Sequence, residues 1–255
     1  KRGEEMAYDI LATSQTPALI VYLLDVSGSM SSSLQGKPRI EVVMEALSAS
    51  LQQVVFRCTK GSQISPRYRI AMYAYSGEVY NILGDVLTID KVANLGVPVL
   101  STMGATATDL GFLEVEKLLS QELSHLENCP APLVCHMTDG EYTGPDPEPV
   151  VRRIMAMGNS DGNVLVENIF ISDNLLAEKI KDPFNWEGVT SDTRLRSEYA
   201  VKLRSMSSPL PEGYRVMMAE SGYRITPGSY MMLPGISPEL VQMGFVMSMS
   251  TPVAQ

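Results

Sequence analysis

The sequence is poor in cysteine, in basic residues and in long apolar runs, and each shortage excludes a class of protein. The 255 residues include only 3 Cys, so we expect no disulfide framework and favour a reducing compartment. Lys and Arg number 20 against 29 Asp and Glu, which gives a net charge of −9 and argues against nucleic acid or an anionic membrane as the main partner. The longest clean apolar run, 18–24, is far shorter than the roughly 20 residues of a membrane-spanning helix.

Further motifs are missing. The chain has no Walker-type phosphate loop and no Gly-x-Ser-x-Gly segment, which argues against an ATPase or a serine hydrolase. It has only 2 His, and His136 lies inside an apolar segment that predicts a buried strand. The first residues are not followed by the apolar stretch of a secretory signal, so we expect a cytoplasmic protein.

Strand-like and helix-like segments alternate along the chain. Strands are expected at 18–24, 68–75, 78–83, 133–137 and 164–171. Helices are expected at 39–58, from 108, at 147–157 after an N-cap at Asp146, around 195–206, and at 238–249 after an N-cap at Ser237. This alternation is typical of βαβ units. It predicts an α/β, Rossmann-like, doubly wound and mostly parallel sheet with helices on both faces.

We expect a single domain over 18–255, preceded by an N-terminal extension at 1–17. Residues 207–235 are rich in Pro, Gly and Met and fit the pattern least, and they leave two alternatives open, a long excursion or an extra hairpin. Of the 16 Met, eight lie in 206–249. Methionine fills cores but also serves adaptable binding surfaces, so both roles stay open for this segment.

Three polar clusters lie where ligands bind in such a sheet. The first, 25–29 (DVSGS), follows the strand 18–24; the second, 104–106 (GAT), precedes a helix; the third, 138–140 (TDG), follows the strand 133–137. In doubly wound sheets, ligands bind outside the carboxyl ends of the strands. If the strands are neighbours, the three loops converge.

The clusters together offer two carboxylates and three hydroxyls. These belong to Asp25, Asp139, Ser27, Ser29 and Thr106. Oxygen ligands suit a hard cation such as Mg²⁺. Because the hydroxyls add no negative charge, the cation would remain electrophilic enough to take a further carboxylate.

The three clusters, in this order and after an apolar strand, resemble the von Willebrand factor A (VWA) domain with its complete metal-ion-dependent adhesion site. The resemblance implies a Rossmann-like sheet with one antiparallel edge strand and a Mg²⁺ site at its top, with Mn²⁺ or Ca²⁺ as substitutes. It implies direct metal contacts from the hydroxyls of Ser27, Ser29 and Thr106, and contacts from Asp25 and Asp139 either directly or through water. It further implies a protein partner whose Asp or Glu completes the metal shell.

The resemblance predicts a protein-interaction module and no enzyme. Among VWA proteins the chain resembles the bacterial stand-alone kind, which includes tellurite-resistance-type proteins encoded beside kinases and phosphatases, and others that work with AAA+ ATPases. We expect an adaptor in a signalling, stress or defence system. One alternative is a metal-dependent phosphatase with Asp25 as nucleophile, although Ser27 stands where that chemistry needs a second acid. The other is a regulatory subunit of an AAA+ complex.

Overall fold

The computed structural model describes residues 8–172, 175–178 and 180–252. Within them a seven-stranded sheet has the order β11-β10-β9-β1-β6-β7, with β8 also pairing with β6. The strands are β1 (Ala18–Asp25), β6 (Tyr68–Tyr75), β7 (Val79–Asn81), β8 (Leu87–Thr88), β9 (Leu133–Thr138), β10 (Leu165–Phe170) and β11 (Met232–Pro234). Two small hairpins, β2 (Ser33–Leu34) with β3 (Lys37–Pro38) and β4 (Thr59–Lys60) with β5 (Gln63–Ile64), lie outside this sheet.

The long strand β1 is the centre of the sheet. It pairs in parallel with β6 on one side and with β9 on the other, and β10 and β11 continue the parallel part. Both β7 and β8 pair with β6 in the antiparallel sense. The predicted mostly parallel sheet with an antiparallel edge is therefore confirmed, and that edge consists of two short strands.

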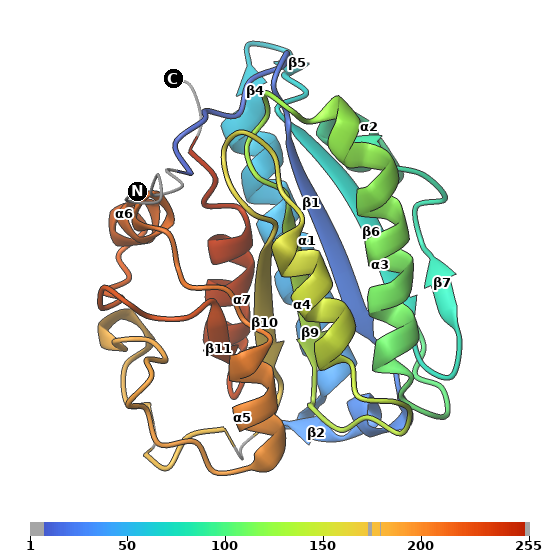
Figure 1. The fold of residues 1–255 in the computed structure, drawn as a ribbon, viewed down its shortest axis with the longest axis vertical. Coiled ribbons are helices and arrows are strands. Elements are labelled where there is room, and N and C mark those ends of the chain that lie inside the picture. The colour runs from blue at the N-terminus through green and yellow to red at the C-terminus, as the bar shows by residue number, and fades with distance from the viewer. Residues whose placement is uncertain (1–7, 173–174, 179, 253–255) are drawn as a thin grey trace.

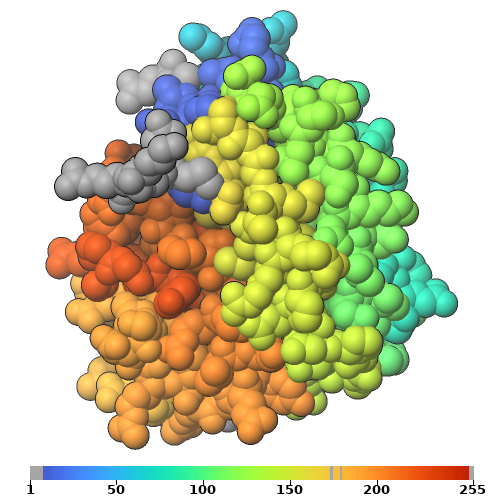
Figure 2. All heavy atoms as spheres, in the orientation of Figure 1, coloured from blue at the N-terminus to red at the C-terminus, as the bar shows by residue number. Residues whose placement is uncertain are grey.

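Helices cover both faces of the sheet (Figure 1). They are α1 (Arg39–Cys58), α2 (Ile89–Leu95), α3 (Thr108–Glu122), α4 (Glu148–Ala156), α5 (Glu198–Ser205), α6 (Glu212–Glu220) and α7 (Pro238–Ser248). Short 3₁₀ turns are η1 (Gly28–Ser31), η2 (Leu123–His125) and η3 (Pro183–Asn185). The helices α1, α2, α6 and α7 contribute to one core, and α3, α4 and α5 to the other. In Figure 2 the latter group, coloured green, yellow and orange, forms a continuous surface over the sheet.

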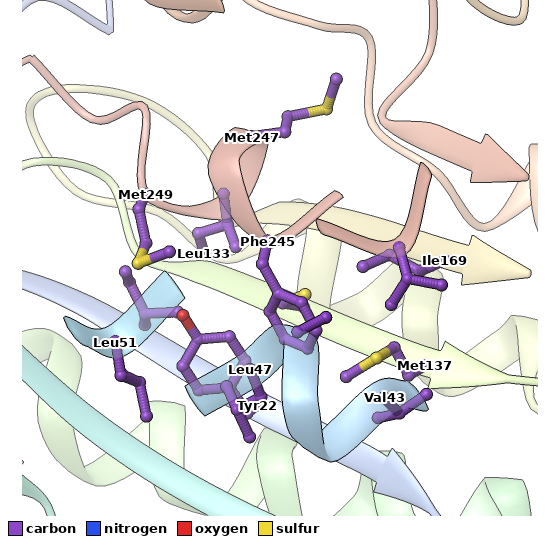
Figure 3. Packing of buried hydrophobic residues seen from close by; sticks show 14 of the residues in the cluster. Tyr22, Val43, Leu47, Leu51, Leu133, Met137, Ile169, Phe245, Met247 and Met249 are labelled. Carbon is purple, nitrogen blue, oxygen red and sulfur yellow. The ribbon is translucent and has the colours of Figure 1, made fainter. Parts of the chain in front are cut away.

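Alternation along β1 supplies both cores. Tyr22 belongs to the core under α1 and α7, whereas Leu23 belongs to the core under α3 and α4, because successive strand side chains point to opposite faces. Figure 3 shows Phe245 of α7 next to Tyr22, with ring centroids 5.8 Å apart. A Cβ at Gly244 would lie 2.3 Å from the side chain of Ile169. The glycine thus allows α7 to lie close against β10.

Several segments agree with the sequence-based expectations. The helix 39–58 and the strand 68–75 have the expected bounds, and Ser237 caps α7 by accepting a hydrogen bond from the Leu240 N–H. The start of α4 is shifted by one residue. Its N-cap is Pro147, although the Asp146 side chain still accepts a hydrogen bond from the Glu148 N–H.

The sequence left an excursion and an extra hairpin open for 207–235, and it predicted no regular element there. The segment contains α6 and the short strand β11, which pairs in parallel with β10. A three-residue strand is too short to give a period, and Pro and Gly around it resemble loop composition. Met218, Met231 and Met232 are fully buried, so in this structure these methionines fill the core.

The first described residues are hydrogen bonded to the chain near the amino ends of β9 and β10. The Asp161 carboxylate accepts hydrogen bonds from the backbone N–H groups of Asp9 and Ile10 at one oxygen, and from Ala131 at the other, each 2.9 Å long. This segment of the predicted extension therefore contacts the sheet domain. Across the described ranges, no helix combines the length and apolar character needed to cross a membrane.

Candidate metal-binding site

Asp25 is the last residue of β1, and its carboxylate organises the loop that follows. It is only 1% exposed. One oxygen accepts a hydrogen bond from the Ser27 N–H at 2.8 Å. The Oγ atoms of Ser27 and Ser29 lie 3.1 Å apart. The alternate residues of this short turn therefore place a carboxylate and two hydroxyls next to one another.

The neighbouring strand β9 brings Thr138 and Asp139 to the same edge. Leu24 is paired with Met137, so Asp25 and Thr138 are the next residues along. The Thr138 hydroxyl donates to the second oxygen of Asp25 at 2.8 Å. Asp139 follows directly and its charge acts on Asp25.

The second loop, 104–106, is hydrogen bonded to the 25–29 loop and to Thr143, which follows the 138–140 turn. Gly28 N–H donates to the Gly104 carbonyl at 3.2 Å. On the other side, Thr106 N–H donates to the Thr143 hydroxyl at 3.1 Å, and the Thr143 N–H donates back to the Thr106 carbonyl at 2.9 Å. The structure therefore brings the three predicted loops together at the carboxyl end of the sheet, which is the lower edge in Figure 1.

Burial dominates the electrostatics of Asp25. Removal from water raises the pKa of its carboxyl to about 6, and the charge of Asp139 adds to this rise. Hydrogen bonds from Ser27 and Thr138 act in the opposite direction. Desolvation penalises a charged group that lacks a counter-charge, so a nearby cation would favour the ionised carboxylate.

The donor set fits a hard divalent cation. Asp25, Asp139, Ser27, Ser29 and Thr106 provide oxygen atoms only, as Mg²⁺ prefers. The Oδ1 atom of Asp139 is buried and has no hydrogen-bond partner among the described residues, and such an oxygen is costly unless something satisfies it. In the described ranges no cluster of three or more His, Cys, Asp or Glu is placed to hold a metal. A cation at this edge would therefore depend on the hydroxyls and on water as well as on the two carboxylates.

Three residues make contacts at the site that the sequence did not indicate. Thr138 belongs to the third polar cluster, and the structure adds its hydrogen bond to Asp25. Thr143 holds the 104–106 loop. Arg39 is the first residue of α1, and its Nη1 donates to Oδ2 of Asp139 at 3.1 Å. A positive charge is unfavourable at the start of a helix. This unfavourable position was the only feature of the sequence that could have suggested a negatively charged partner for Arg39.

His136 is a core residue, as expected. It is fully buried, with one ring nitrogen 2.8 Å from the Tyr75 hydroxyl and the other 2.8 Å from the side-chain oxygen of Asn168. Burial lowers the pKa of His136 to about 4. The ring is therefore neutral at physiological pH and serves as a hydrogen-bonded link between β6, β9 and β10.

Comparisons with known proteins support the fold. Neither a family model nor a curated protein matches the chain. The PilB minor pilin from Streptococcus sanguinis matches with a TM-score of 0.56 and 12% identity, over 93% of this chain and 62% of that one. Proximal thread matrix protein 1 from the mussel byssus gives a TM-score of 0.48 and 14% identity, over 94% and 48%. The SpRpn10 VWA domain gives 0.46 and 11%, over 89% and 92%.

The chain thus spans less than two thirds of PilB and of the mussel protein. At such low identity the similarity concerns the fold alone. The chain therefore shares its overall fold with PilB.

Proposed function

We propose that the protein is a metal-dependent protein-interaction module. Asp25, Ser27, Ser29, Thr106 and Asp139 hold a divalent cation, with Mg²⁺ as the physiological ion. An Asp or Glu side chain of a partner protein supplies a further oxygen ligand. The cation thereby joins the two proteins, and affinity depends on both the ion and the partner's carboxylate.

The convergence of the three loops is the observation that carries this proposal. Direct hydrogen bonds connect the 25–29 loop to Thr138 and to Gly104, and the 104–106 loop to Thr143. Within this cluster, Asp139 offers a buried oxygen with no hydrogen-bond partner in the described chain. A cation is the ligand that satisfies such an oxygen next to a second buried carboxylate.

The surroundings of Asp25 support binding over catalysis. Both of its oxygens accept hydrogen bonds, and the side chain is buried. A nucleophilic carboxylate needs an oxygen free to attack and a neighbouring acid for the leaving group, and the residue two positions on is Ser27. These features favour the interaction module over the phosphatase.

The setting is proposed on the resemblance described above. We propose a cytoplasmic adaptor of bacterial type in a signalling or stress system. Its partner is a kinase, a phosphatase or an AAA+ ATPase that presents an acidic side chain. The excess of acidic residues in the chain is consistent with a protein partner and with no direct binding of nucleic acid or membrane.

Calorimetric titration with Mg²⁺ and Mn²⁺ tests the metal step. We expect one binding site in the wild type, and loss of binding in Asp25→Ala and Asp139→Ala. Asp146→Ala is the matched control, since Asp146 lies on the same loop but is exposed and pairs with Lys202. Equal heats in wild type and Asp25→Ala would contradict the proposal.

A pulldown from native lysate tests the partner step. The protein is used as bait in Mg²⁺, in EDTA and as Asp25→Ala in Mg²⁺. We expect a partner that is retained only by wild type in Mg²⁺ and is lost when its acidic residues are neutralised. A partner retained equally in all three conditions would place the binding surface elsewhere.

A further inference from the structure

Arg39 forms a half-buried ion pair with the candidate site. Its side chain is 20% exposed and that of Asp139 is 3% exposed, with 3.1 Å between Nη1 and Oδ2. By contrast, the nearby pair of Lys37 and Glu45 is 50% and 54% exposed. The guanidinium is thus largely removed from solvent and lies next to a carboxylate that the proposed function assigns to the cation.

The position of Arg39 is unfavourable except for this contact. It is the first residue of α1, after Pro38, where the helix dipole disfavours a positive charge. Its Nε is buried and has no hydrogen-bond partner in the described part of the chain. Asp139 is the carboxylate that pairs with Arg39 in the described structure. The charge of Arg39 therefore belongs to the site electrostatically.

The charges at the site can be counted. Asp25 and Asp139 contribute two negative charges and Arg39 one positive charge, so the ionised cluster carries −1. A divalent cation changes this to +1, and one carboxylate from outside brings it to zero. Without Arg39, the cation alone would bring the net charge to zero, so the electrostatic demand for a third carboxylate would be weaker.

We propose that Arg39 is a specificity-determining residue that makes the site selective for a cation accompanied by a partner's carboxylate. This inference rests on the proposed function and goes beyond it. The positive charge of Arg39 repels a bare cation and attracts the incoming anion. Charges separated by less than about 10 Å interact strongly in partly buried sites. We therefore expect Arg39 to lower the affinity for the bare cation by roughly 10-fold.

The test measures Mn²⁺ affinity with no partner present, by electron paramagnetic resonance of the free ion. Titrations are run in chloride and in acetate at equal ionic strength, with correction for Mn²⁺–acetate complexes. Acetate serves as the probe for an acidic side chain. The variants are Arg39→Met, which removes the charge, and Arg39→Lys, which keeps it.

Arg69→Met is the matched control. Arg69 pairs with Glu122, and its side chain is 25% exposed, so its loss removes a comparable ion pair from a different place. A thermal melt of every variant confirms that each one is folded. Asp25→Ala marks the signal expected without a site.

We expect Arg39→Met to bind Mn²⁺ in chloride about 10-fold more tightly than wild type and to lose most of the gain that acetate gives to wild type. Arg39→Lys and Arg69→Met should follow wild type. Unchanged affinity and unchanged acetate gain in Arg39→Met would overturn the role of Arg39 while leaving the metal site intact. If wild type shows no Mn²⁺ binding that depends on Asp25, the proposed function itself fails, and this inference fails with it.

Discussion

The hydroxyl of Thr138 donates a hydrogen bond to Oδ2 of Asp25 over 2.8 Å. The same hydroxyl accepts a hydrogen bond from the Gly140 N–H at 2.9 Å. It thus links the ends of β1 and β9 and also shapes the turn that carries Asp139. One uncharged side chain thus connects the carboxylate of Asp25 to the turn that contains Asp139.

Thr138→Val should destabilise the protein by about 2–3 kcal/mol. The substitution keeps the shape but leaves a buried carboxylate oxygen without a donor and a buried N–H without an acceptor. Urea unfolding at neutral pH measures the change. Thr138→Ser restores the hydroxyl and should recover most of the loss, and a Val variant as stable as wild type would show that the bond is unimportant.

Asp25→Asn should stabilise the protein in EDTA at pH 7.5 while abolishing any response to Mg²⁺. The pKa of Asp25 is raised from 3.8 to about 6, so the ionised form is disfavoured in the folded state. The protonated carboxyl therefore stabilises the folded state. This contribution is complete below pH 3.8 and is lost as the pH rises through 6. At about 1.4 kcal/mol per pKa unit, the amide should gain up to about 3 kcal/mol. Exposed Asp146→Asn should show no such gain, and a less stable Asp25→Asn would contradict the expectation.

Gly140→Ala should be far more damaging than Gly36→Ala. The two glycines have nearly the same φ, +93° and +90°, but a Cβ at Gly140 would lie 2.1 Å from the ring of Phe170, whereas Gly36 has open space. The shared backbone strain costs about 1–2 kcal/mol in each, and the clash should add about 1–3 kcal/mol at Gly140 alone. Parallel urea unfolding of the two variants separates these contributions. Equal losses would mean that Phe170 moves freely aside.

His136→Gln should weaken the dependence of stability on pH between 6.5 and 4. The pKa of His136 is lowered from 6.5 to about 4 by burial, so the unfolded chain binds the extra proton first. The stability associated with the neutral ring is complete above pH 6.5 and is lost as the pH falls towards 4, by up to about 3 kcal/mol. The difference in the free energy of unfolding between wild type and variant across this range separates the contribution of His136 from those of the buried acids. His125, which is exposed, provides the control His125→Gln, which should retain the wild-type dependence.

Much of the fold could be predicted because its signals are local. The continuous apolar run of β1 and the apolar stripe of α1 are readable from a few neighbouring residues. The convergence of the three loops also followed, since parallel neighbours end at the same edge of a sheet. The strand β11 within 207–235 was not predicted, because it has only three residues and its pairing with β10 leaves no periodic pattern in the local sequence.

The site itself was predicted only in part. The motif gave the oxygen ligands, but Arg39 and Thr143 lie on segments that reach the site through the tertiary fold. Arg39 precedes Asp139 by 100 positions in the chain, and nothing in the sequence near either residue indicates the other. Such partners depend on how the loops pack, which periodicity and spacing do not specify.

The hydrogen bonds between Asp161 and the first described residues also bear on where the protein can be attached to a surface. Tyr8 and Asp9 lie near Asp161, and the Ala12 N–H donates to the Pro252 carbonyl at 2.7 Å, so both described chain ends lie at the upper edge in Figure 1. The candidate site lies at the other edge. A sensor surface or resin attached next to Tyr8 or Pro252 would therefore lie on the side of the domain opposite the site, and the site would stay open to the solution.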